Sequence, residues 1–429
     1  MNYSDKVRVF LASHGMEPDG LDLEECAARF IADMELGLAG LTSSLDMIPT
    51  YLTCGVPAAG SKAAVIDAGG TNFRVALVAF TESGPVIERM ERYAMPVSDS
   101  AATWEDFISF SAEKLLPFLD EAGAIGFCFS YRAEVTPERD GRVIAMSKAV
   151  QLAGCEGRLV CADLLAELRR RGAPERSAVI VNDTAAVMLS GSSLLSGGEY
   201  DGLVGLVCGT GQNTCCAIDP GRIRKLGLPA GEPMIVNLES GCFDGLPRGD
   251  FDRELDAAST LPGDHLLEKM TSGAYLGELC RLTLRGAAAD GLFSPAGAEA
   301  ALGLASLSSA EADALASGAP GGPFSEAADA ETAAELCMAV YERAAACIAV
   351  NLASILLFTG AGHEPDRPAC ICADGSTIVK SRCLRPALEE QLRSFAETEL
   401  GLHAVIHTSD EAPVIGTAAA ALLNALEIA

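Results

Sequence analysis

Two short glycine-rich segments, each set between apolar runs, constrain the fold of this chain more than any other feature. The first, DAGGTNFR at 67–74, is preceded by AAVI and followed by VALVAF. The second lies within GLVGLVCGTGQNTCCAID at 202–219, and Gly209 follows Gly69 by 140 residues. An apolar strand, a tight glycine turn and a second apolar strand predict a β-hairpin in each place. Two such hairpins at this separation suggest a duplicated domain.

Apolar runs with strand patterns alternate with helical patterns along most of the chain, which is typical of α/β architecture. We expect a helical lead-in over residues 5–52, closed by Pro49. Residues 286–332 predict short helices and a mobile surface excursion without chemistry. The other expected elements are strands at 87–97, 124–131, 177–183, 369–376 and 403–407, and helices at 104–122, 159–172, 332–358, 384–399 and 412–426.

Composition excludes several classes of partner and site. The 31 basic and 59 acidic residues give a formal net charge of −28, so we expect neither nucleic acid nor an anionic membrane to bind. The apolar stretch 345–358 is shorter than the ~20 residues that a membrane span needs, and predicts a buried helix. The fifteen cysteines include no C-x-x-C pair, and the sequence begins without an apolar signal core. We therefore expect reduced thiols, no zinc motif and a cytoplasmic location.

The residues at the tip of the first hairpin suit a phosphate group. Consecutive glycines let backbone N–H groups approach an anion, Thr71 and Asn72 add side-chain donors, and Arg74 adds a planar positive group. Asp67 fits beside phosphates if Mg²⁺ with its water ligands lies between them. A tight glycine turn is also common in hairpins that bind nothing.

Two better-known nucleotide motifs are absent. GTGQNT lacks the third glycine of G-x-G-x-x-G, and GVPAAGSK at 55–62 has its serine and lysine in the wrong order for a P-loop. The sequence therefore disfavours a dinucleotide-dependent dehydrogenase and a P-loop ATPase.

Eight segments occur in the order in which a known family has them: IDAGGTNFRV, GFCFSY, SKAV, VNDT, CGTGQN, NLESGCFDG, LEKMTSGAYLGELCRL and ADGS. In this order they resemble the hexokinase family, within the actin-like ATPase (ribonuclease H-like) fold. The resemblance covers most of the chain. It implies an α/β protein of two lobes, built on duplicated mixed sheets flanked by helices, with a central cleft. The small lobe would comprise 61–181 plus 415–429, and the large lobe 1–60 plus 182–414.

The resemblance implies an ATP-dependent hexokinase that moves the γ-phosphoryl group of MgATP to the 6-hydroxyl of a hexose, glucose being the first expectation, and that feeds glycolysis. Asp183 would be the general base, while Lys148 and Arg74 would neutralise charge. The sugar would be bound by Ser130, Ser147, Lys148, Asn182, Asp183, Asn213, Glu239 and Glu268. For the nucleotide, Asp67 would reach Mg²⁺ through water, and the phosphate and adenosine contacts would come from Gly69, Gly70, Thr71, Asn72, Arg74, Gly209, Thr210, Gly211, Gly375 and Ser376.

Without the resemblance, Asn182-Asp183-Thr184 at a strand end is most often a helix N-cap. Three departures from the family pattern leave the sugar and donor open. Arg132 follows Tyr131 where the family usually has proline, Met146-Ser147-Lys148-Ala149-Val150 lacks the family's Trp, Gly and Phe, and Pro413-Val414-Ile415 replaces small residues before the last helix.

Three other readings of this sequence stay open. The first is a kinase for another hexose or an amino sugar. The second is a non-catalytic sugar-binding regulator of the same fold, which would have no need of a base. The third is a filament-forming or chaperone-like ATPase, which would not require the residues that suit a sugar. The sequence does not indicate an oligomeric state.

Overall fold

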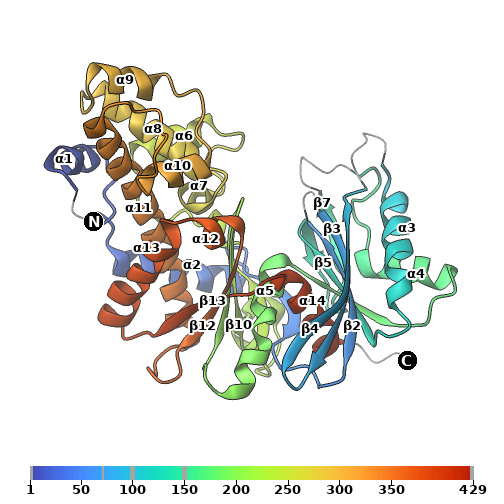
Figure 1. Cartoon of the computed structure of the whole chain (residues 1–429). Helices are drawn as coiled ribbons and strands as arrows, with labels where there is room; N and C mark the ends of the chain where they lie inside the picture. Colours follow the sequence, from blue (N-terminus) through green and yellow to red (C-terminus); the bar gives the residue numbers. More distant parts are fainter. Residues whose placement is uncertain (1–2, 70–71, 97–101, 147–151, 426–429) are drawn as a thin grey trace.

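The computed structural model describes residues 3–69, 72–96, 102–146 and 152–425, and within them two β-sheets lie side by side with helices around them (Figure 1). The five-stranded sheet has the order β4-β3-β2-β5-β8 and the six-stranded sheet the order β1-β11-β10-β9-β12-β13. The strands are β1 (Ile48–Thr53), β2 (Lys62–Ala68), β3 (Asn72–Thr81), β4 (Gly84–Ala94), β5 (Ala124–Phe129), β8 (Ser177–Val181), β9 (Leu203–Cys208), β10 (Gln212–Ile218), β11 (Met234–Asn237), β12 (Ala369–Asp374) and β13 (Ala404–Thr408); β6 (Arg132–Val135) and β7 (Gly141–Ala145) form a separate ribbon.

The two sheets repeat one topology. In the first, β2–β3 and β3–β4 are antiparallel, whereas β2–β5 and β5–β8 are parallel. In the second, β9–β10 and β10–β11 are antiparallel, whereas β9–β12 and β12–β13 are parallel. Both glycine-tipped segments are therefore the first hairpin of a repeated mixed sheet, and the duplication predicted from the sequence is confirmed.

Helices cover both sheets. In chain order they are α1 (Asp5–Ser13), α2 (Leu23–Ala39), α3 (Trp104–Leu115), α4 (Val160–Arg170), α5 (Asp183–Ser190), α6 (Asp250–Ala258), α7 (Leu266–Thr271), α8 (Leu276–Ala289), α9 (Pro295–Leu302), α10 (Ser309–Ala316), α11 (Ala327–Thr359), α12 (Ser376–Lys380), α13 (Leu384–Gln391) and α14 (Ala412–Asn424). A π-helix, Leu392–Glu399, continues α13.

The layer between the two sheets consists of α5 and α14 (Figure 1). Alternate residues of β2 face opposite ways: Ala64 and Ile66 join a core with α3 and α4, while Ala63 and Val65 join a core with α5 and α14. The second core also contains residues of β9, β10 and β12. Both faces of the central strands of each sheet are thus buried, which explains why these strands read as nearly continuous apolar runs.

Helix α11 is the central helix of the larger core. Among the described residues it alone combines the length and mean hydropathy, 1.5, of a membrane span, but 89% of its most apolar window is buried within the fold. Its buried Arg343 forms an ion pair of 2.8 Å with Asp252, and its Asn351 accepts a hydrogen bond from Thr214. The buried helix predicted for this segment is confirmed.

Two expectations about secondary structure were wrong. Residues 40–47 are not helical, and residues 48–53 form β1, which pairs with β11 at the edge of its sheet, where the missing N–H of Pro49 is tolerated. Within 286–332 the predicted short helices are present as α9 and α10, but they pack firmly, with Ala301 and Ala312 fully buried. Small apolar side chains at helical spacing let these helices approach their neighbours closely, so this region is part of the large-lobe core rather than a mobile excursion.

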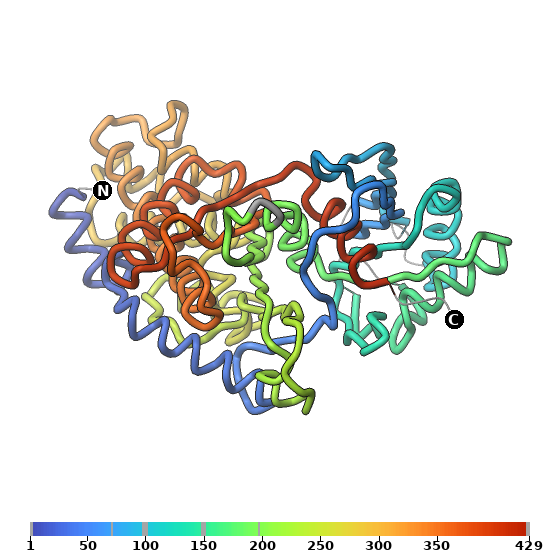
Figure 2. The backbone as a smooth tube through the Cα atoms, turned by 90° about the horizontal axis from the view of Figure 1, so that it is seen from below, coloured from blue at the N-terminus to red at the C-terminus, as the bar shows by residue number. Residues whose placement is uncertain are grey.

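All strands of the five-stranded sheet fall within residues 61–181, and those of the six-stranded sheet fall outside that range. We therefore propose that the lobes follow the predicted division, 61–181 plus 415–429 and 1–60 plus 182–414. The N-terminal and C-terminal ends of the described chain lie on different lobes (Figures 1 and 2).

Candidate active site

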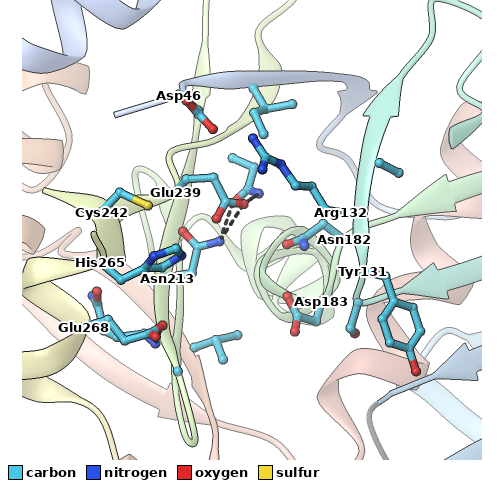
Figure 3. A pocket seen from close by; sticks show the side chains of 18 of the residues that line it. Asp46, Tyr131, Arg132, Asn182, Asp183, Asn213, Glu239, Cys242, His265 and Glu268 are labelled. Carbon is cyan, nitrogen blue, oxygen red and sulfur yellow. Dashed lines mark hydrogen bonds between the residues drawn. The ribbon is translucent and has the colours of Figure 1, made fainter. Parts of the chain in front are cut away.

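A cavity of about 710 Å³ lies between the two sheets, at the ends of strands from both (Figure 3). Asn182, Asp183, Tyr131 and Arg132 lie on one side of it, and Asn213, Glu239, His265 and Glu268 lie on the other. Six of the eight residues predicted to bind the sugar line this cavity: Ser130, Asn182, Asp183, Asn213, Glu239 and Glu268. The other two, Ser147 and Lys148, lie outside the described residues.

Asn182 and Asp183 are held at the junction of β8 and α5. The side-chain oxygen of Asn182 accepts a hydrogen bond of 2.9 Å from the backbone N–H of Thr184, which makes it the N-cap of α5. Asp183 accepts from the same N–H at 2.7 Å. The Asn182-Asp183-Thr184 triplet is thus a helix N-cap, as expected for it without the family resemblance. The same cap fixes the Asp183 side chain at the cavity.

The electrostatic setting of Asp183 suits a proton acceptor. Burial raises the pKa of Asp183 above its ordinary value, hydrogen bonds from Thr184 act in the opposite direction, and the nearby charge of Asp67 raises it further. A carboxyl group with a raised pKa binds a proton more strongly than an exposed one does.

On the opposite wall, Asn213 is fixed by several hydrogen bonds. Its amide group donates to Asn237 at 2.8 Å, and its carbonyl oxygen accepts from the backbone N–H groups of Thr214 and Ser240 at 2.7 and 3.1 Å. Glu239 has a left-handed backbone with φ of 56° and accepts a hydrogen bond from Asn237. This network holds an amide and a carboxylate toward the cavity in fixed orientations.

Glu268, in the first turn of α7, accepts a hydrogen bond of 3.1 Å from the backbone N–H of Gln212, just after the second glycine turn. Gly241 permits this arrangement, because a Cβ there would lie 2.6 Å from the Gln212 carbonyl oxygen. Burial raises the pKa of both Glu239 and Glu268. The cavity thus presents carboxylates and amides, the groups that bind a polyhydroxylated molecule well.

A second cavity, of about 360 Å³, adjoins the first. Ser130, Asp183 and Val207 line both cavities. The second one is also lined by the predicted phosphate-site residues Asp67, Gly69, Asn72, Arg74 and Thr210, and by Val187, Asp374 and Pro413. Asp183 therefore lies where a polyol-type site and a phosphate-type site meet.

Arg74 is engaged by two carboxylates. It lies opposite Asp67 in the β2–β3 pairing and donates to it from Nε at 2.5 Å, and it also pairs with Glu411. Burial raises the pKa of Asp67, and the charge of Arg74 opposes that rise. Glu411, the N-cap residue of α14, has a φ of 57° and pairs with Arg92 through its other oxygen. Sequence reasoning missed Glu411, although it lies two residues before the Pro413-Val414-Ile415 departure from the family pattern.

Gly211 lines the first cavity, whereas Gly209, Gly375 and Ser376 are not among the described residues lining either cavity. Gly375 has a φ of 114°, and a Cβ there would lie 2.5 Å from the backbone of Cys208. Its observed role is to let the end of β12 approach the turn at 208–211. The predicted sites Gly70 and Thr71 lie outside the part of the chain that the structure describes.

Further lining residues were not predicted as site residues: Asp46, Tyr131, Arg132, Cys242, Asp244, Asp264 and His265. Cys242 and Asp244 lie inside the NLESGCFDG segment, and Asp264-His265 directly precedes LLEKM. Their position in or next to a family motif could therefore have indicated that these four residues lie at the site. Burial raises the pKa of the Cys242 thiol to about 12, and the charges of Glu239 and Asp264 add to this.

Comparisons with known proteins show which family and which solved structures this chain resembles. Residues 11–193 and 203–423 match the two sequence domains that define hexokinases. Hexokinase-1 of Oryza sativa subsp. japonica is 35% identical over 286 residues, covering 61% of this chain and 56% of the rice protein. Hexokinase-2 of Homo sapiens is 32% identical over 282 residues, covering 61% of this chain and 30% of the human protein. The matched part of this chain thus spans about half, or less, of these curated relatives.

A solved structure of a hexokinase from Schistosoma mansoni, complexed with glucose, superimposes with a TM-score of 0.75. The superposition covers 98% of this chain and 100% of that one, at 24% identity. The predicted two-lobed fold, with duplicated mixed sheets flanked by helices, is confirmed by this likeness.

Proposed function

This chain belongs to the hexokinase family, and on that premise we propose that it is an ATP-dependent hexokinase that phosphorylates the 6-hydroxyl of a hexose, glucose first among the candidates. The observation that carries the proposal is the meeting of the two cavities at Asp183, which puts a carboxylate between a polyol-type site and a phosphate-type site. We also propose that the reaction feeds glycolysis. A cytoplasmic location is proposed separately, because fifteen free thiols suit a reducing compartment.

In the proposed reaction, the sugar is held by Ser130, Asn182, Asn213, Glu239 and Glu268, together with Ser147 and Lys148. The oxygen of the 6-hydroxyl attacks the γ-phosphorus of ATP while Asp183 accepts the hydroxyl proton. The new O–P bond replaces the bond between the γ-phosphorus and the ADP oxygen, so ADP leaves. Closure of the two lobes around the sugar would exclude water, a competing acceptor.

The donor phosphates would bind in the smaller cavity, against the two glycine turns, with Arg74 and Lys148 neutralising charge. The carboxylates of Asp67 and Asp374 line this cavity, and oxygen donors of this kind suit Mg²⁺. We propose that Asp67 contacts the Mg²⁺ of MgATP through water. The ion would shield the charge of the phosphates in this acidic setting.

A second candidate function is phosphorylation of an amino sugar. The larger cavity is lined by six carboxylates, those of Asp46, Asp183, Glu239, Asp244, Asp264 and Glu268, whereas Arg132 is the only Lys or Arg among the described lining residues. This excess of negative charge favours a substrate that carries an ammonium group.

Formation of sugar 6-phosphate from MgATP tests both candidates, with glucose, mannose, fructose and glucosamine as acceptors. Product from glucose with the highest kcat/KM supports the first candidate, and a higher kcat/KM for glucosamine supports the second. Binding of a sugar by calorimetry without product from any of the four would contradict a kinase and favour the sugar-binding regulator.

The rate should depend on pH through Asp183. A base must be ionised to accept a proton, and burial raises the pKa of Asp183 above 3.8. We expect kcat/KM to fall as the pH drops through this raised pKa, at a higher pH than that at which an exposed aspartate is protonated. The measurement is kcat/KM for the sugar between about pH 4 and pH 8. A rate that stays level to the acid end of this range would exclude Asp183 as the base.

Replacing Glu411 by Gln should improve donor binding. In the structure Glu411 pairs with the guanidinium of Arg74, so in the proposed reaction it would compete with the donor phosphates for that group. Because partly exposed ion pairs contribute about 0.2–1 kcal/mol, we expect KM for ATP to fall by up to about fivefold, with kcat little changed. Glu389→Gln, which removes a carboxylate paired with Arg385 in α13, is the matched control. A higher KM in Glu411→Gln alone would show that Glu411 orients Arg74 rather than competing for it.

A further inference from the structure

Three side chains of different metal-binding types meet on one wall of the larger cavity. The Cys242 sulfur, a carboxylate oxygen of Asp264 and a ring nitrogen of His265 all lie within 4.8 Å of one another. Figure 3 shows Cys242 and His265 on the same side of the cavity as Glu239 and Glu268. We refer to Cys242, Asp264 and His265 as the thiol–imidazole cluster.

The backbone holds the two halves of the thiol–imidazole cluster together. Cys242 closes a short 3-10 turn, and His265 is the N-cap residue of α7. The N–H of Leu267 donates to the carbonyl of Phe243 at 3.2 Å, which ties the two segments directly. His265 Nδ1 lies 3.0 Å from Asp264 Oδ1, so these two side chains are already in contact. The cluster is therefore assembled by the fold before any ligand binds.

We propose that the thiol–imidazole cluster binds a thiophilic divalent cation, Zn²⁺ being the best match. Thiolate, imidazole and carboxylate are the three ligand types that zinc takes in proteins, at distances of about 2.0–2.3 Å. Ligand atoms of a tetrahedral zinc site are therefore about 3.5 Å apart. The side chains of the cluster, whose ligand atoms lie within 4.8 Å of one another, would draw closer together when zinc binds. Zinc displaces the thiol proton when it binds. Three protein ligands leave a fourth position open, and here it faces the cavity.

The surrounding charge favours a cation at this place. Asp46, Glu239 and Glu268 also lie close enough to Cys242 for their charges to act on its thiol. A zinc ion bound here occupies part of the space that the proposed function assigns to the sugar. Zinc and hexose would then compete for the cavity. This competition rests on the proposed function, whereas metal binding by the cluster does not.

The first experiment is titration of the full chain with Co²⁺, a spectroscopic substitute for Zn²⁺, without sugar or ATP. A thiolate–cobalt absorption band is expected in the wild type, and Zn²⁺ is expected to displace it. In Cys242→Ala and His265→Gln the affinity should fall at least about tenfold, since loss of even an outer partner of a metal ligand costs about 10–100-fold. Matched controls are Cys54→Ala, which removes another half-buried thiol, and His403→Gln; both should keep the band.

An unchanged band in Cys242→Ala, or loss of the band in Cys54→Ala, would overturn the site. Circular dichroism melts of each variant separate loss of a ligand from loss of the fold. The second experiment repeats the titration with glucose, which should raise the apparent dissociation constant for Co²⁺; no change with any sugar that binds would overturn the competition. An intact cobalt band in a protein without kinase activity would contradict the proposed function and leave the metal site standing.

Discussion

Replacing Asp183 by Asn should lower kcat by at least about 100-fold, the lower range for a positioned acid–base group. Asn keeps the shape of the side chain and an oxygen that can accept the hydrogen bond from the N–H of Thr184, so the start of α5 should persist. What it loses is the capacity to take a proton from the sugar hydroxyl. The measurement is the steady-state formation of sugar 6-phosphate, with sugar affinity determined separately by calorimetry.

The stability of this variant distinguishes lost chemistry from lost structure. The pKa of Asp183 is higher in the folded state than in the unfolded state, so protonated Asp183 stabilises the fold. This stabilisation is fully present at a pH below the unfolded-state pKa, and it is lost as the pH rises through the folded-state pKa. Ionised Asp183 therefore destabilises the fold near neutral pH, and the neutral Asn side chain should give a melting temperature at least equal to that of the wild type. Near-wild-type kcat in a stable Asp183→Asn protein would rule out the proposed base.

The second large effect is expected at Gly416, where α14 crosses α5 between the two sheets. A Cβ at this position would lie 1.6 Å from the carbonyl oxygen of Ala186, which is a backbone atom of α5 and has little freedom to move. The same helix also lies close to β5, since a Cβ on Gly126 would be 2.5 Å from the carbonyl oxygen of Thr417. There is no room for α14 to retreat toward β5.

Gly416→Ala should therefore destabilise the protein by about 1–3 kcal/mol or more, the usual cost of overpacking a core. Thermal and denaturant unfolding measure this loss. Gly231→Ala is the matched control, because its added Cβ meets nothing within 4 Å, and it should melt like the wild type. Equal stability of the two variants would mean that α14 can shift away from α5 without cost.

Local sequence patterns predicted a large share of this molecule. Both glycine hairpins, the buried helix near 345–358 and the duplicated α/β fold were predicted correctly, because strand and helix periods depend on residues near in sequence. Strand β1 was missed, because its partner strand β11 lies about 185 residues further along the chain. The roles of the site residues stay predictions, although the fold brings six of the predicted sugar-binding residues to one cavity.

The sequence by itself determined the family, the two hairpins and the N-cap that fixes Asp183, because each is recorded in a short run of residues. Only the tertiary structure decided which distant charges and ligands meet. Arg74 and Glu411 are 337 residues apart in the chain, and Cys242 reaches His265 through the contact of a 3-10 turn with α7. The thiol–imidazole cluster has no C-x-x-C spacing from which the sequence could have predicted it. Contacts of this kind depend on sheet register and helix packing, which bring together side chains that no local period relates.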